Sequence, residues 1–199
     1  MDFTLRQTVR TIAALLITAA VTQSIYTAMY IAEMTPPRQL MWGLEALIFV
    51  LLAAFAGSAL AQAKTLSLGF AAIAFAAALN VVQVGIGLTM FEPFFGAAEA
   101  IEALGPIADS ILAFSFMVYN AAKILLGLAA IVFGMAKANA GSKALGGLTV
   151  IVGGIAMLAN SLSMAIGRDF MGEIPLAGGS GVLATILLAL CLSSVVNDD

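Results

Sequence analysis

The feature that most constrains this chain is a single lysine inside a long apolar segment. Lys123 lies near the middle of residues 107–136, where the only other charge is Asp109 near the start. The chain is 62% hydrophobic and 10% charged, with a mean hydropathy of +1.10. A soluble domain of this size cannot hide so much apolar surface, so we expect a lipid bilayer around it. A charge in mid-bilayer costs roughly 3 kcal/mol on insertion scales, so Lys123 needs a partner, a cavity or a route to the surface.

Six apolar windows predict six transmembrane helices, because about 20 apolar residues are enough to cross a bilayer. The windows are residues 11–32, 40–63, 66–90, 107–136, 144–167 and 180–196. Their connections are short and leave no room for a soluble domain. We therefore expect an all-α fold in which residues 1–199 form a single integral membrane domain, a polytopic helical bundle.

Residue types that are rare or missing exclude several kinds of chemistry. The chain has no histidine and one cysteine, Cys191. Haem ligation through histidine, most zinc sites, internal disulfides and Ser-His-Asp hydrolysis are therefore excluded, and we expect no cofactor, no metal and no catalytic residue. The formal charge of −3 and the lack of a basic cluster predict no nucleic-acid partner. The expected partners are the lipid bilayer and, as an open alternative, further copies of the chain or a larger membrane complex.

The distribution of charged residues predicts the orientation of the bundle. Five basic residues fall on one side of the expected spans: Arg6, Arg10, Lys64, Lys137 and Lys143. The opposite loops hold two basic residues and most of the acidic ones. Both termini are therefore predicted to be cytoplasmic in a cytoplasmic-type (inner) membrane, with the first span uncleaved. Aromatic residues are expected at the outer interface: Tyr30, Trp42, Phe91, Phe94, Phe95 and Phe170.

The connection between the third and fourth spans predicts a short interfacial helix. Pro93 suits the start of such a helix, and Gly105-Pro106 suits its end. Helical spacing places two sets of side chains on separate faces, an apolar set (Phe94, Ile101, Leu104) and an acidic set (Glu92, Glu99, Glu102). This pattern is typical of an amphipathic helix that lies on the outer leaflet. The third external loop, which includes Arg168, is expected to be irregular as far as Gly179.

Two expected hairpins, formed by spans 2–3 and spans 4–5, show a weak sequence repeat. Span 3 contains Asn80 followed by Gly87, and span 5 contains Asn160 followed by Gly167. A duplicated hairpin would relate the two by a pseudo-two-fold axis along the membrane normal, as in some transporters. Chance matches in apolar sequence of low complexity are the alternative.

The polar residues inside the spans form the candidate site. Several of them lie at similar depths in the outer half of the membrane, at a rise of about 1.5 Å per residue. The candidates for solute binding are Lys123, Asn120, Asn80, Gln83, Asn160, Gln23 and Glu45. One interpretation is a polar cavity open to the external side, with Lys123 at its floor and the amides as its walls. Glu45, which we expect near the outer surface, is placed to form a charge-pair gate with Lys123. The other interpretation is that these groups join the helices by interhelical hydrogen bonds.

These patterns leave three hypotheses about function. The first is a small transport or channel protein that holds an anion, ion or dipolar solute beside Lys123. The second is a non-catalytic accessory or assembly subunit of a larger membrane complex. The third is an enzyme acting on a lipid or quinone, which would use the acidic outer loop to bind a divalent cation. Solvated acidic side chains on an interfacial helix explain that loop better, because the spacing of an EF-hand is missing, so enzyme activity is the least favoured hypothesis.

Overall fold

The computed structural model describes residues 3–167 and 176–195, and this part of the chain is helical without strands. Its elements are α1 (Leu5–Ile31), α2 (Arg38–Gln62), α3 (Ser67–Thr89), α4 (Phe91–Ala100), η1 (Glu102–Leu104), α5 (Gly105–Asn139), α6 (Lys143–Ile166) and α7 (Leu176–Val195). Six helical segments, built on α1, α2, α3, α5, α6 and α7, are long and apolar enough to cross a membrane. The prediction of an all-α bundle with six such helices is therefore confirmed.

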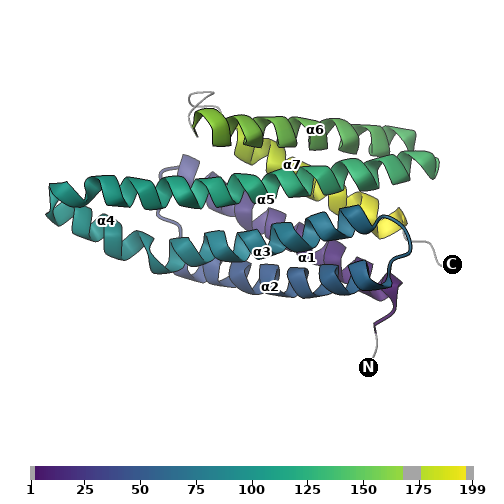
Figure 1. Cartoon of the computed structure of the whole chain (residues 1–199), viewed down its shortest axis with the longest axis horizontal. Coiled ribbons are helices and arrows are strands. Elements are labelled where there is room, and N and C mark those ends of the chain that lie inside the picture. Colours follow the sequence, from purple (N-terminus) through teal and green to yellow (C-terminus); the bar gives the residue numbers. More distant parts are fainter. Residues whose placement is uncertain (1–2, 168–175, 196–199) are drawn as a thin grey trace.

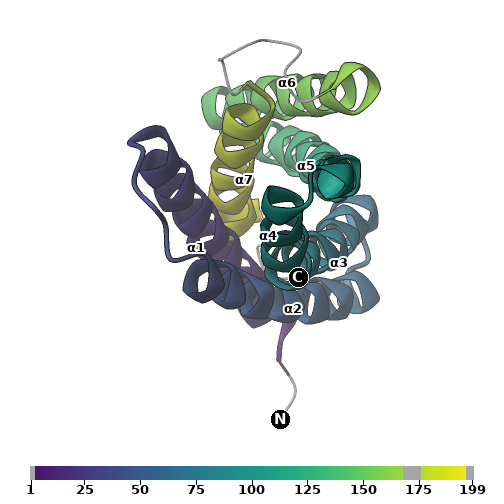
Figure 2. The same cartoon turned by 90° about the vertical axis from the view of Figure 1, so that its left-hand side faces the viewer.

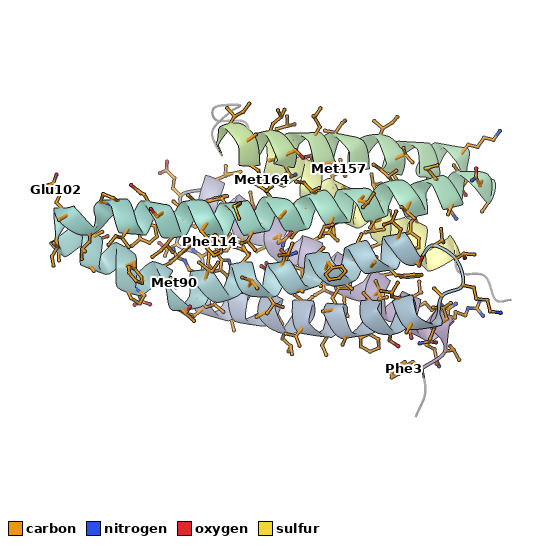
Figure 3. The ribbon with its side chains drawn as sticks, viewed as in Figure 1. Phe3, Met90, Glu102, Phe114, Met157 and Met164 are labelled. Atoms are coloured by element: carbon orange, nitrogen blue, oxygen red, sulfur yellow. The ribbon has the colours of Figure 1, made fainter. Side chains whose placement is uncertain are left out.

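The outside of the bundle is apolar along its length. Large hydrophobic side chains project outward from all six long helices, and Phe75 on α3 is 66% exposed. Phe114 on α5 and Met164 on α6 belong to the same surface (Figure 3). So extensive an apolar surface is unfavourable in water and suits a lipid environment.

Five of the long helices form a ring, with the sixth outside it. Neighbouring helices follow the order α1, α2, α3, α5, α7 and back to α1, while α6 packs only on α5 and α7 among the described elements. Figure 2 shows this ring end-on. In Figure 1, α1 begins and α7 ends at one end of the bundle, and α4 lies at the other. We call these the terminal end and the α4 end.

The inside of the ring is apolar toward the terminal end. Buried residues there include Leu16, Leu52, Phe70, Leu126 and Phe133. The rings of Phe70 and Phe133 meet edge to face, with their centroids 5.0 Å apart. Thr8 is a buried polar residue at this end, but Glu45, Asn80 and Lys123 are buried nearer the α4 end of the same helices, so the interior of the ring has a mainly apolar half and a more polar half.

Helix α6 is held against α5 by reciprocal glycine contacts. A Cβ atom on Gly127 would lie 2.8 Å from the Gly153 carbonyl oxygen, and a Cβ on Gly153 would lie 2.8 Å from the Gly127 carbonyl oxygen. The backbones can therefore approach this closely only because both residues lack a side chain. Small residues in this chain thus serve packing within the bundle.

The connection between α3 and α5 is helical but differs from the prediction. Helix α3 bends at Met90 into α4, which ends at Ala100, because Ile101 has an extended backbone. The expected apolar and acidic faces, which ran through Ile101 to η1, are therefore wrong. Gly105-Pro106 opens α5 and does not close α4. Glu102 stands exposed at the far tip (Figure 3), and an interfacial position of α4 stays a prediction.

Other expectations about loops and repeats have mixed outcomes. Helix α7 begins at Leu176, so the third loop is shorter than expected, and Arg168 and Phe170 lie outside the described residues. The hairpin duplication is unconfirmed. Helix α3 packs on α5, but among the described residues α6 has no matching contact with α2.

Candidate functional site

The Lys123 ammonium lies inside the ring and reaches a neutral amide. Lys123 is 1% exposed, and its Nζ donates a hydrogen bond to Oε1 of Gln23 at 2.6 Å. Helices α1 and α5 are not neighbours in the described bundle. The lysine side chain therefore crosses the interior of the ring from α5 to reach α1. The ammonium does not point into lipid.

Two further residues fix the position of Lys123. Nζ lies 5.1 Å from the ring centroid of Tyr119, one helical turn earlier on α5, which is within the range of a cation–π interaction. On α7, a Cβ at Gly181 would lie 2.9 Å from Cδ of Lys123. Because Gly181 has no side chain, α7 can lie directly against the lysine stem.

Glu45 supplies a negative charge close to the ammonium without forming an ion pair with it. The side chain is 4% exposed and faces the bundle interior, while its expected depth near the outer surface of the membrane stays a prediction. Lys123 is near enough to attract the carboxyl electrostatically, and Thr22 lies beside the carboxyl, with its hydroxyl donating to the backbone carbonyl of Ala19 at 3.0 Å. Oε1 of Glu45 has no hydrogen-bond partner among the described residues. The ammonium thus has a neutral partner on α1, Gln23, whereas the carboxyl only lies beside Thr22. We call Thr22, Gln23, Glu45, Tyr119 and Lys123 the lysine site.

Three of the predicted amides join helices to one another. Nδ2 of Asn120 donates to Oγ of Ser163 at 3.0 Å, and Nε2 of Gln83 donates to Oγ of Ser115 at 3.4 Å. Nδ2 of Asn160 donates to the backbone of α7 at Ala177, 3.1 Å away. These contacts match the interpretation in which amides hold the bundle together.

Asn80 differs from Gln83, Asn120 and Asn160 in that it makes no hydrogen bond to another helix among the described residues. It is fully buried on α3, and its Nδ2 donates to the carbonyl of Ala76 in its own helix at 2.9 Å. Its Oδ1 has no hydrogen-bond partner among the described residues. Trp42 on α2 lies against Gly87 on α3, and Glu45 and Asn80 lie further along these helices toward the terminal end. Glu45, Asn80 and Asn160 thus each have a buried acceptor atom without a donor among the described residues.

Aromatic side chains cover the lysine site at the α4 end. Trp42 and Tyr26 lie three residues from Glu45 and Gln23, about one turn closer to that end, and their ring centroids are 5.4 Å apart. Trp42 also contacts Phe91 of α4, at 5.7 Å. Seen from the α4 end, α4 stands in front of the middle of the ring (Figure 2).

The aromatic belt expected at the outer interface stays a prediction, because a level in the membrane does not follow from these contacts. Trp42 and Phe91, two of its members, pack on each other, and Phe91 is buried. The Arg38 guanidinium lies 5.5 Å from the Trp42 ring centroid, which adds a cation–π contact on the same side. Tyr26 and Trp42 are only partly buried. Phe94 stays exposed.

The arrangement brings together some of the predicted residues and adds others. Gln23, Glu45 and Lys123 meet in the lysine site, whereas Gln83, Asn120 and Asn160 serve helix contacts. Tyr119 and Gly181 were not anticipated. Tyr119 was findable from its spacing of four residues to Lys123, which places both on one helix face. Gly181 carries no such signal, because its role depends on how α7 docks.

The chemistry open to this site is the binding of polar groups. Lysine has three donor hydrogens, and one of them is directed at Gln23. Glu45 and Asn80 each offer an acceptor atom without a partner among the described residues. No group of His, Cys, Asp and Glu suited to a metal ion occurs in the described ranges.

The comparisons with known proteins give no match. No protein-family model, no curated protein and no solved structure resembles this chain closely enough to be identified. The function has to be inferred from the geometry of the lysine site.

Proposed function

We propose that this protein is a small membrane transport or channel protein that binds a solute or ion at the lysine site. One observation carries the proposal. A buried ammonium crosses the ring interior from α5 to α1 and rests on a neutral amide, although a carboxylate lies nearby. Ionisable groups inside membrane bundles mark ligand or ion pathways more often than they serve packing.

A purely structural role predicts a different arrangement. A lysine kept for packing gains most from a direct ion pair, because each charge then compensates the other in a low dielectric. Here the amide of Gln23 accepts from Nζ, and Glu45 keeps an oxygen without a partner. Both charged groups retain hydrogen-bonding capacity that a ligand can use.

The packing at the two ends of the ring supports an occluded state of such a protein. Apolar side chains fill the ring toward the terminal end, and Tyr26, Trp42 and Phe91 cover it at the α4 end. Passage of a solute then requires one end to open, which is the behaviour expected of alternating access. In the proposed orientation the α4 end is external and both termini are cytoplasmic, in an inner membrane.

Osmotic flux measurements test this proposal across many solutes at once. Purified protein in proteoliposomes is exposed to gradients of small ions and dipolar solutes, and the change in vesicle volume is followed by light scattering. Wild-type protein should accelerate the movement of at least one solute over empty vesicles, and Lys123→Met should abolish the acceleration. Lys64→Met removes an exposed lysine by the same substitution and should keep the flux.

The outcomes separate the proposal from its rival. Equal flux through wild type and Lys123→Met would contradict a role for the lysine site. Absence of flux for every solute, with a stoichiometric partner copurifying from native membranes, would favour the accessory-subunit hypothesis. An unchanged elution profile and helical circular dichroism of Lys123→Met show that loss of flux does not reflect unfolding.

A further inference from the structure

The lysine site contains a basic and an acidic side chain that are not paired with each other. Lys123 donates to Gln23, and Glu45 lies beside Thr22. Thr22 and Gln23 are consecutive residues of α1, so both groups lie against the same turn of this helix. They come from α5 and α2, which are not neighbours among the described elements.

The hydrogen-bonding capacity that Glu45 and Lys123 do not use inside the protein is complementary. Glu45 is buried and its Oε1 lacks a donor, while Nζ of Lys123 has donor hydrogens beyond the one given to Gln23. A carboxylate accepts hydrogen bonds from an ammonium, and an ammonium donates them to a carboxylate. The unpartnered oxygen of Glu45 is thus suited to a cationic group, and Lys123 to an anionic one.

The charge balance of the site selects against ligands with a net charge. When both groups are ionised, the two side chains sum to zero. A simple anion would satisfy Lys123 but leave Glu45 as an excess charge in a low dielectric, and a simple cation would do the reverse. A molecule that carries both charges leaves no excess. At the Glu45 end, the Trp42 ring one turn away on α2 adds an aromatic face of the kind that favours an ammonium.

We propose that the ligand of the lysine site is a small zwitterion, with its carboxylate on Lys123 and its ammonium on Glu45. This inference rests on the proposed function only in so far as it concerns the same site. It assigns the class of ligand and the role of each charged residue, and it can be tested by binding alone.

Binding to purified protein in detergent micelles tests the inference. The probes are glycine and γ-aminobutyrate as zwitterions of two lengths, acetate as an anion and methylammonium as a cation. Affinity is measured from the fluorescence of Trp42, the single tryptophan of the chain, and from thermal stabilisation. Wild type should bind one of the zwitterions at least about tenfold more tightly than either singly charged probe, because these leave an uncompensated charge.

Two neutralising variants sharpen the test. Glu45→Gln should reverse the preference toward acetate, and Lys123→Met should reverse it toward methylammonium. A reversal is a gain of binding, so it does not arise from misfolding. Lys64→Met should behave as wild type.

The opposite results would overturn the inference. These are equal binding of acetate and zwitterions by wild type, or the same selectivity in both neutralising variants. Failure of the inference is distinguishable from failure of the proposed function. Flux of a simple ion without zwitterion binding would support the transport function and contradict the zwitterion as ligand. Reversal of selectivity without any flux would support the ligand class and contradict the transport function.

Discussion

The hydrogen bond between Lys123 and Gln23 should be worth far more than a neutral hydrogen bond in the same bundle. Gln23 provides the one hydrogen bond that Nζ makes among the described residues, at 2.6 Å. Hydrogen bonds to charged groups contribute roughly 1.5–3 kcal/mol. Neutral interhelical bonds in a membrane protein average only about 0.6 kcal/mol. Asn120 and Ser163, which are buried and 3.0 Å apart, form a matched neutral pair in this chain.

Two double-mutant cycles compare these pairs. The first combines Gln23→Leu with Lys123→Met, and the second combines Asn120→Leu with Ser163→Ala. We expect Gln23→Leu alone to destabilise the fold by about 3 kcal/mol, because it strands a buried charge. Adding Lys123→Met should restore most of that loss. The coupling energy should be about 2 kcal/mol for the lysine pair and about 0.6 kcal/mol for the neutral pair.

The free energy of unfolding of every variant in both cycles is measured in mixed micelles. The fraction of dodecyl sulfate is raised, and unfolding is followed by Trp42 fluorescence. Trp42 packs against Tyr26 and Phe91 in the folded bundle, so its emission reports on the fold. Coupling energies are resolved to about 0.5 kcal/mol in such cycles. Two couplings equal within that margin would refute the reasoning, because the ammonium would then draw its compensation from elsewhere.

Three further substitutions test how packing supports the site. Gly181→Ala should push the Lys123 stem aside, since its Cβ would lie 2.9 Å from Cδ, and the lysine-pair coupling should fall by about half in the same unfolding assay. Gly87→Val should displace the Trp42 ring from its contact with α3. Acrylamide quenching of Trp42 fluorescence would detect the displacement as increased access to the indole, and unchanged quenching would show that the aromatic cover does not depend on this contact. Gly153→Leu should separate α6 from α5 and lower the free energy of unfolding by about 1–3 kcal/mol or more, and a stability equal to wild type would contradict the close approach of the two backbones.

The fold was largely predictable because its strongest signal is long apolar sequence. Each window of about 20 residues became a helix, and α1 is longer than expected because the polar segment before residue 11 is also helical. The region from Met90 to Gly105 was less predictable. Pro93 lies in the first turn of α4 as expected, but Gly105-Pro106 was assigned to the end of that helix and instead opens α5, since proline fits the first turn of either helix.

The site was predictable in its residue types and less so in its pairings. Lys123 and Gln23 stand out as polar residues in apolar segments, but they are 100 positions apart and their helices are not neighbours. Helix periodicity identifies which residues share a face of one helix, not which face meets the interior of a ring. For that reason the periodicity of residues 40–63 did not predict that Glu45 faces the interior of the ring.

Access of water-borne reagents to position 123 tests the central claim most directly. In a Cys191→Ala background, Lys123→Cys is compared with Phe75→Cys, which replaces an exposed residue on the apolar outer surface. Both are treated with a charged, membrane-impermeant thiosulfonate in proteoliposomes. A site that opens to admit a solute predicts modification at position 123 and protection at position 75. Protection at both positions, with position 123 still reactive after unfolding, would contradict a binding site for solutes inside the ring.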